Sequence, residues 1–160
     1  MGKGFENDRK WLQEKKNDVA IRTMEYKEKV EELSEKKQEF EEGIARIPTD
    51  LPDDLSSQIQ SAIDNARLDI QNEAKKLDEE GDNIRDTADE MMDVADMLQS
   101  DYLQKASQLN SLRDIPIVGN FVEKAGGDMA DRVTEIQDLR QETQKYEDEL
   151  AAYQNRVRGR

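Results

Sequence analysis

Residues 63–98 read IDNARLDIQNEAKKLDEEGDNIRDTADEMMDVADML, and an apolar residue returns at every seventh position of this stretch. The repeating residues are Ile63, Ile70, Leu77, Ile84, Met91 and Leu98. A spacing of seven keeps one side of a slightly under-wound helix facing a neighbouring helix, as in coiled coils. The stretch therefore predicts a long helix that packs through a single apolar seam.

Two further seams with the same spacing flank this one. The first is Phe5, Leu12, Val19, Tyr26, Leu33, Phe40 and Ile47, and the last is Val122, Met129, Ile136, Thr143, Leu150 and Val157. Pro48 and Pro52 separate the first two seams, and Pro116 with Gly119 separates the second from the third. Because proline ends helices and glycine permits sharp turns, we expect three helices, over residues 6–46, 55–112 and 120–156. The expected fold is a single all-α domain over residues 1–160, an elongated antiparallel helical bundle resembling a coiled coil.

Gly81 lies in the middle of the second predicted helix. A turn at this glycine would split the helix and give four helices in all. A continuous helix is favoured, since the seam keeps its phase through Gly81. Ala74, Gly81, Ala88 and Ala95 also form a line of small residues, along which another helix could approach closely.

The composition suits a narrow seam between long helices. Hydrophobic residues make up 34% of the chain and charged residues 39%. The net charge of −14 is concentrated in residues 51–114, which contain 16 acidic and 6 basic side chains. Such a surface repels phosphates and anionic lipid headgroups, so we expect neither nucleic acid nor stable membrane insertion.

The residue inventory excludes many kinds of catalytic site. The chain has no cysteine and no histidine, which removes thiolate nucleophiles, histidine triads and the common zinc ligand sets. The acidic run from Asp82 to Asp96 lacks the ligand spacing of a calcium loop, and no phosphate-binding glycine motif is present. The paired Met91 and Met92, with Met97, are expected to pack in the core rather than to form an adaptable binding surface. We therefore expect no enzymatic activity, no metal and no cofactor.

The beginning of the chain does not predict a secretory signal peptide. Residues 1–10, MGKGFENDRK, contain no apolar segment of the kind found in secretory signal peptides. We expect the protein to be cytoplasmic when synthesised, with export by a leaderless route as an alternative.

The segment DIPIVGNFV, residues 114–122, is the one place where apolar residues gather outside the seams. The candidate contact residues are Ile115, Ile117, Val118, Phe121 and Val122. These side chains could fold over the end of the bundle as a plug, or they could form an exposed patch that contacts a partner.

Long antiparallel helices joined by a tight turn, in an acidic chain without cysteine, resemble the small helical substrates and helper proteins of Gram-positive type VII secretion. That group includes WXG-type proteins and the LXG-type N-terminal domains of toxins with their partner proteins. Ile115–Gly119 is similar to apolar proline- and glycine-containing stretches between targeting regions and toxin modules. The turn at 47–54 lacks Trp-x-Gly, and the single tryptophan is Trp11. The resemblance therefore implies a helical fold and a secretion context, and it assigns no site residue.

The sequence as a whole predicts a non-enzymatic helical module for protein–protein interaction. Its partner would be another helical protein or a second copy of the chain, and the resemblance implies a secreted effector or toxin. The alternative is a purely structural coiled-coil scaffold or self-assembling spacer.

Overall fold

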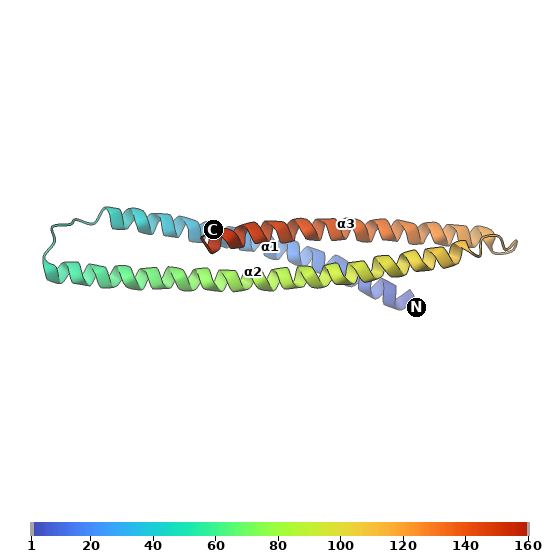
Figure 1. Ribbon diagram of the computed structural model, residues 1–160, viewed down its shortest axis with the longest axis horizontal. Helices are drawn as coiled ribbons and strands as arrows, with labels where there is room; N and C mark the ends of the chain where they lie inside the picture. Colours follow the sequence, from blue (N-terminus) through green and yellow to red (C-terminus); the bar gives the residue numbers. More distant parts are fainter. Residues whose placement is uncertain (1, 160) are drawn as a thin grey trace. The chain divides into compact units, whose positions relative to one another are not determined.

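The computed structural model describes residues 2–159, with side chains from residue 4 onward. It contains the helices α1 (Gly2–Ala45), α2 (Asp53–Asn110) and α3 (Gly119–Val157), and no strand within the described residues (Figure 1). The prediction of an all-α bundle with three long helices is confirmed. Each boundary lies within a few residues of the position expected from the prolines and glycines.

Helix α2 runs without interruption through Gly81, so the alternative of four helices is wrong. The reason lies in what Gly81 touches. A Cβ atom at this position would come within 2.7 Å of the Gln154 side chain on α3. The missing side chain thus lets α3 approach α2 closely, and neighbouring α3 residues compensate the low helix propensity of glycine.

The helices pack as two compact units, and each helix contributes a segment to both. One unit, called the first unit below, contains the chain up to Ile21 together with Arg85–Asp148. The other, the second unit, contains Arg22–Ile84 and the chain from Glu149 onward.

Ion pairs fix the directions of the helices in the first unit. Lys16 of α1 pairs with Glu142 of α3 at 2.6 Å, and Arg9 pairs with Glu135 at 2.7 Å, so these helices run parallel. The short contact between Arg140 and Asp96 lies between α3 and α2, which run in opposite directions. The buried side chains of this unit include Leu12, Val19, Met91, Leu98, Tyr102 and Ile136.

In the second unit, α1 and α2 run antiparallel. Lys29 pairs with Glu80 and Lys36 with Glu73, each at 3.0 Å, so residue numbers rise on one helix as they fall on the other. Tyr26, Val30, Ile84, Leu150 and Gln154 are almost fully buried here. The predicted seams therefore form the core in both units.

Gln154 is a buried polar residue in this core, and its side-chain amide is hydrogen-bonded. Its side-chain nitrogen donates to the carbonyl oxygen of Asp78 at 3.0 Å and to a carboxylate oxygen of Asp82 at 2.8 Å. Buried polar groups are tolerated when they are hydrogen-bonded, and such pairs fix the register of neighbouring helices. Gln154 above Gly81 thus sets where α3 lies along α2.

Two tyrosines carry buried hydroxyl groups that have no hydrogen-bond partner within the described part of the chain. They are Tyr26 in the second unit and Tyr102 in the first. Burial, with a smaller contribution from the nearby Asp78 carboxylate, raises the pKa of Tyr26 to about 12. Tyr102 packs its ring against Phe5 with ring centroids 5.0 Å apart. Both side chains contribute mainly as large apolar groups.

Candidate interaction surface

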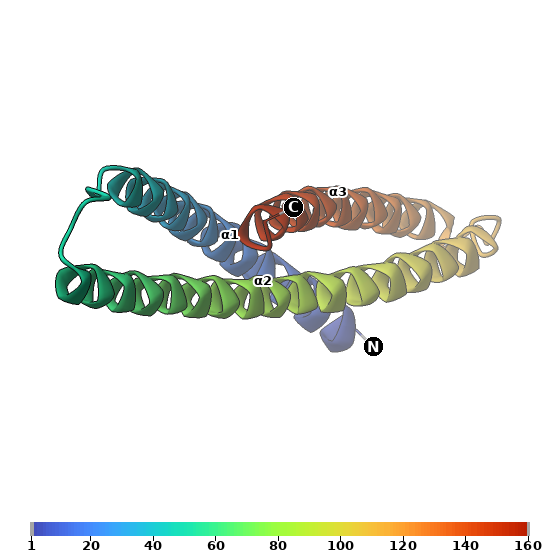
Figure 2. The same ribbon diagram turned by 60° about the vertical axis from the view of Figure 1, so that its left-hand side comes forward.

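The connection between α2 and α3 is a short loop at one end of the first unit (Figure 2). Its backbone is largely hydrogen-bonded to itself. The amide of Ile115 donates to the Leu112 carbonyl at 3.1 Å, and the amide of Gly119 donates to the Ile115 carbonyl at 2.8 Å. Gly119 is required here because a Cβ atom would clash with the carbonyl oxygen of Arg113. The loop is therefore a defined structure that presents its side chains outward.

The apolar side chains of this loop are exposed. Ile117 is 93% exposed and Phe121 is 76% exposed, whereas Ile115 and Val118 are partly covered. We call these four residues the apolar tip. Side chains as exposed as Ile117 and Phe121 do not contribute to the core. The tip residues therefore do not form a plug over the helix ends.

Val122 was predicted to be a contact residue, but the structure buries it. It is buried, with only 6% of its surface exposed, because it is the first residue of the α3 seam and faces the interior. Val122 therefore belongs to the core of the first unit and is removed from the set of candidate contact residues.

A groove adjoins the apolar tip. It has a volume of about 680 Å³, and its walls come from the beginning of α1, the last turns of α2 and the first half of α3. We call it the tip groove. Its lining residues are Phe5, Glu6, Lys105, Gln108, Leu109, Leu112, Met129 and Arg132. Glu6 pairs with Arg132 at 3.2 Å on its rim, and apolar side chains form most of its floor.

The heptad spacing places Phe121 on the same side of α3 as this groove. Glu135 and Glu142, which bind side chains of α1, follow Phe121 by two and three full heptads. Residues one heptad apart lie on the same side of a helix. Phe121 therefore lies on the side of α3 that contacts α1 at Glu135 and Glu142. It does not itself line the tip groove.

The surroundings of the tip differ in charge from the rest of α2. Residues 53–101 contain 15 acidic and 4 basic side chains, whereas residues 102–127 contain two acidic and three basic ones. The tip is thus an almost neutral, apolar section, where another negatively charged molecule meets less repulsion than along residues 53–101 of α2.

Sequence reasoning identified the loop but missed the groove beside it. The signal was present at Lys105, which takes the seam position seven residues after Leu98 and is followed by Leu112 at the next one. A charged residue in a seam shows that the helices no longer enclose that position on all sides.

The other sequence candidates lie in ordinary places. Met91 is buried in the core, as expected, while Met97 is half exposed. Within the described residues, no group of acidic side chains is arranged to hold a metal ion. No helix in that part of the chain is both long and apolar enough to cross a bilayer.

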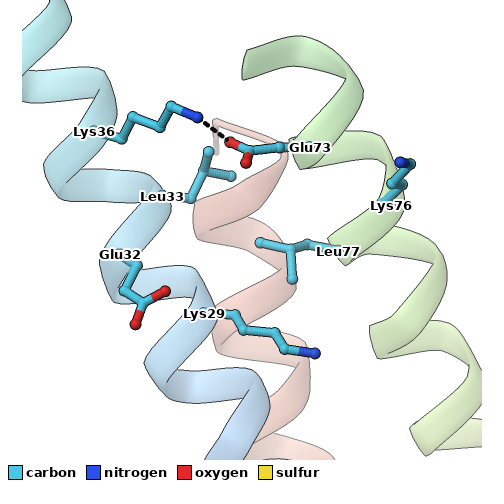
Figure 3. A pocket seen from close by; sticks show the side chains of 7 residues that line it. All are labelled: Lys29, Glu32, Leu33, Lys36, Glu73, Lys76 and Leu77. Atoms are coloured by element: carbon cyan, nitrogen blue, oxygen red, sulfur yellow. Dashed lines mark hydrogen bonds and ion pairs between the residues drawn. The ribbon is translucent and has the colours of Figure 1, made fainter. Parts of the chain in front are cut away.

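A second hollow lies between α1 and α2 in the second unit (Figure 3). It has a volume of about 420 Å³, with the side chains of Leu33 and Leu77 on its floor. Lys36 reaches across to Glu73 at 3.0 Å, as the dashed line in the figure shows. Lys29 makes a similar bond to Glu80. These exposed ion pairs bridge the two helices, so the hollow is an ordinary furrow of a helix pair.

Comparison with known proteins found no matching family model, no significantly similar curated protein and no significantly similar solved structure.

Proposed function

We propose that this protein is a non-enzymatic helical module for protein–protein interaction and that the apolar tip is its contact surface. The observation that carries this proposal is the exposure of Ile117 and Phe121 on an otherwise strongly polar chain. Apolar anchors at the centre of a contact, surrounded by polar groups, carry most of the binding energy in protein interfaces. A partner that is itself helical, or a second copy of the chain, fits a surface built from two helix ends and a loop.

The biological context that we propose is a partner or targeting protein for a secreted effector or toxin. It rests on the resemblance to type VII secretion substrates. If the identified partner is neither secreted nor encoded with a secretion system, this part of the proposal fails and the interaction module remains.

The experiment is affinity capture with crosslinking from the native organism, followed by mass spectrometry. The double variant Ile117→Ser with Phe121→Ser should lose the partner that the unchanged chain captures. Ile21→Ser with Met24→Ser is the matched control, since these α1 side chains are also well exposed, at 59% and 67%. Capture by the control and loss by the tip variant support the proposal. Equal capture by both variants contradicts it.

The second candidate function is a structural scaffold or spacer. It is favoured by the three seams, which supply most of the buried side chains of both units. A scaffold would associate only with itself, and its capture experiment would return no other protein.

A further inference from the structure

The apolar tip is exposed and the tip groove is open, so neither fills the other. Phe121 projects from α3 with 76% of its surface exposed, and the groove beside it is lined by Leu109, Leu112 and Met129. A surface that carries both a projecting side chain and a hollow of apolar lining is self-complementary. Self-complementarity is the condition for a two-fold symmetric contact between identical chains.

We propose that two copies of this chain dimerise through this surface, with Phe121 of each copy inserted into the tip groove of the other. The inference rests on the proposed function, because it assigns a specific occupant to the same contact surface.

The charge distribution favours a second copy of the chain as the partner and the surface around the tip as the contact. Each copy carries a net charge of −14, so contact through most surfaces would bring like charges together. The section from residue 102 to residue 127 lacks this excess of acidic groups, with three basic and two acidic side chains. Lys105 stands on the groove wall, where its ammonium group donates to the Gln108 side-chain oxygen over a long distance of 3.4 Å.

The size of the apolar surface sets the expected strength of the contact. The exposed parts of the tip residues and Leu112 amount to on the order of 500 Å² per copy. A standard specific interface buries about 800 Å² per partner. We therefore expect a weak dimer with a dissociation constant in the micromolar range, in equilibrium with the monomer.

The first test is sedimentation equilibrium of the full chain over a wide range of concentrations. The unchanged chain should show a monomer–dimer equilibrium. Phe121→Asp and, separately, Leu112→Lys should each weaken association at least tenfold, because each places a charge in the apolar contact. Leu103→Asp is the matched control, since Leu103 is 53% exposed on α2 but does not line the groove. The Leu103→Asp variant should dimerise with the same affinity as the unchanged chain.

The second test asks whether Phe121 and the groove meet across the interface. An equimolar mixture of the Phe121→Asp chain and the Leu112→Lys chain should form a heterodimer. In that pair the new carboxylate faces the new ammonium group on one side, and an unchanged phenylalanine meets an unchanged groove on the other. Circular dichroism of each variant should show unchanged helix content, which excludes unfolding as the cause of dissociation.

Three results would overturn the inference. One is a monomeric unchanged chain at all concentrations, including the case where it instead binds vesicles of neutral phospholipid through the tip. Another is a dimer that both variants leave intact. The third is a mixture in which no heterodimer forms. If the chain is monomeric but captures a different protein through Ile117 and Phe121, this inference fails while the proposed function stands.

Discussion

The core of the second unit and the apolar tip of the first unit contain the same kinds of apolar side chain, but those in the core are buried and those at the tip are exposed. Ile84, Tyr26 and Leu150 are completely buried where segments of three helices meet. Ile117 and Phe121, in and just after a loop, are largely in water. Three helices enclose a seam on all sides, whereas the side chains of the loop between two helix ends are left partly or largely exposed. The exposed residues at the tip are therefore not needed for folding, which makes them available for binding.

The largest effect should come from placing a charge in the enclosed core. Ile84→Asp would leave an unpaired carboxylate among apolar side chains, at a cost of about 4 kcal/mol of unfolding free energy. Ile117→Asp, the matched change at the tip, should alter stability by less than about 0.5 kcal/mol. Urea denaturation followed by circular dichroism measures both. Equal losses of stability would show that the tip belongs to the core after all.

A smaller effect should follow from filling the close approach at Gly81. Gly81→Leu would push the Gln154 side chain away and break its bonds to Asp78 and Asp82, at a cost of about 2–3 kcal/mol. Gly43→Leu is the control, because a Cβ at Gly43 would meet no described heavy atom within 4 Å apart from its chain neighbours and the backbone of its own helix. Improved helix propensity should stabilise that variant by up to about 1 kcal/mol. Thermal unfolding measures the stability of both variants. If both are stabilised, the bonds of Gln154 do not contribute to the stability of the contact at Gly81.

The next effect concerns pH and the helix contact around Glu147 in the first unit. Burial raises the pKa of Glu147 to about 7, and a hydrogen bond with Asp89 contributes to the shift. The folded pKa lies above the ordinary value of 4.5. The stabilisation from the protonated Glu147 carboxyl is therefore complete below pH 4.5, and it is lost as the pH rises through about 7.

We expect the difference in stability between the unchanged chain and Glu147→Gln to change by on the order of 1 kcal/mol between pH 4.5 and pH 8, after allowance for solvent screening. The unchanged chain should lose stability relative to the variant as the pH rises. Denaturant titrations at several pH values measure this difference. A difference that stays constant over the whole range would show that Glu147 ionises normally.

The smallest effect should be found on the exposed faces of the helix pair. Lys36→Ala removes an ion pair with Glu73 in which both side chains are about half exposed. Such pairs contribute between zero and about 0.5 kcal/mol. A loss above 1 kcal/mol in urea denaturation would mean that the furrow between α1 and α2 is more than a surface feature.

Much of the fold could be predicted from the sequence, and the residues show why. Most of the seam residues from Leu12 to Val157 are buried, because a seven-residue period keeps them on the one side of the helix that faces its neighbours. Thr143 also fits its seam position, since its hydroxyl donates to the Leu139 carbonyl at 2.7 Å within the same helix. The continuity of α2 followed from a seam that kept its phase through Gly81.

For the candidate site, the sequence located the loop and its apolar residues but not their exposure. It placed Val122 among the contact residues, because nothing local distinguishes the first seam residue of α3 from its neighbours. It also gave no hint that Gln154 lies over Gly81, since the two are far apart in the chain.

The sequence by itself determined which residues form helices, where those helices end and which side of each is apolar. These properties depend on spacing, proline and glycine, which act locally. Only the tertiary structure decided that Gln154 sits above Gly81, that Val122 is buried and that Phe121 stands free beside an open groove. Those outcomes depend on how far one helix extends past another, and that distance is set by packing between segments that the sequence alone does not align.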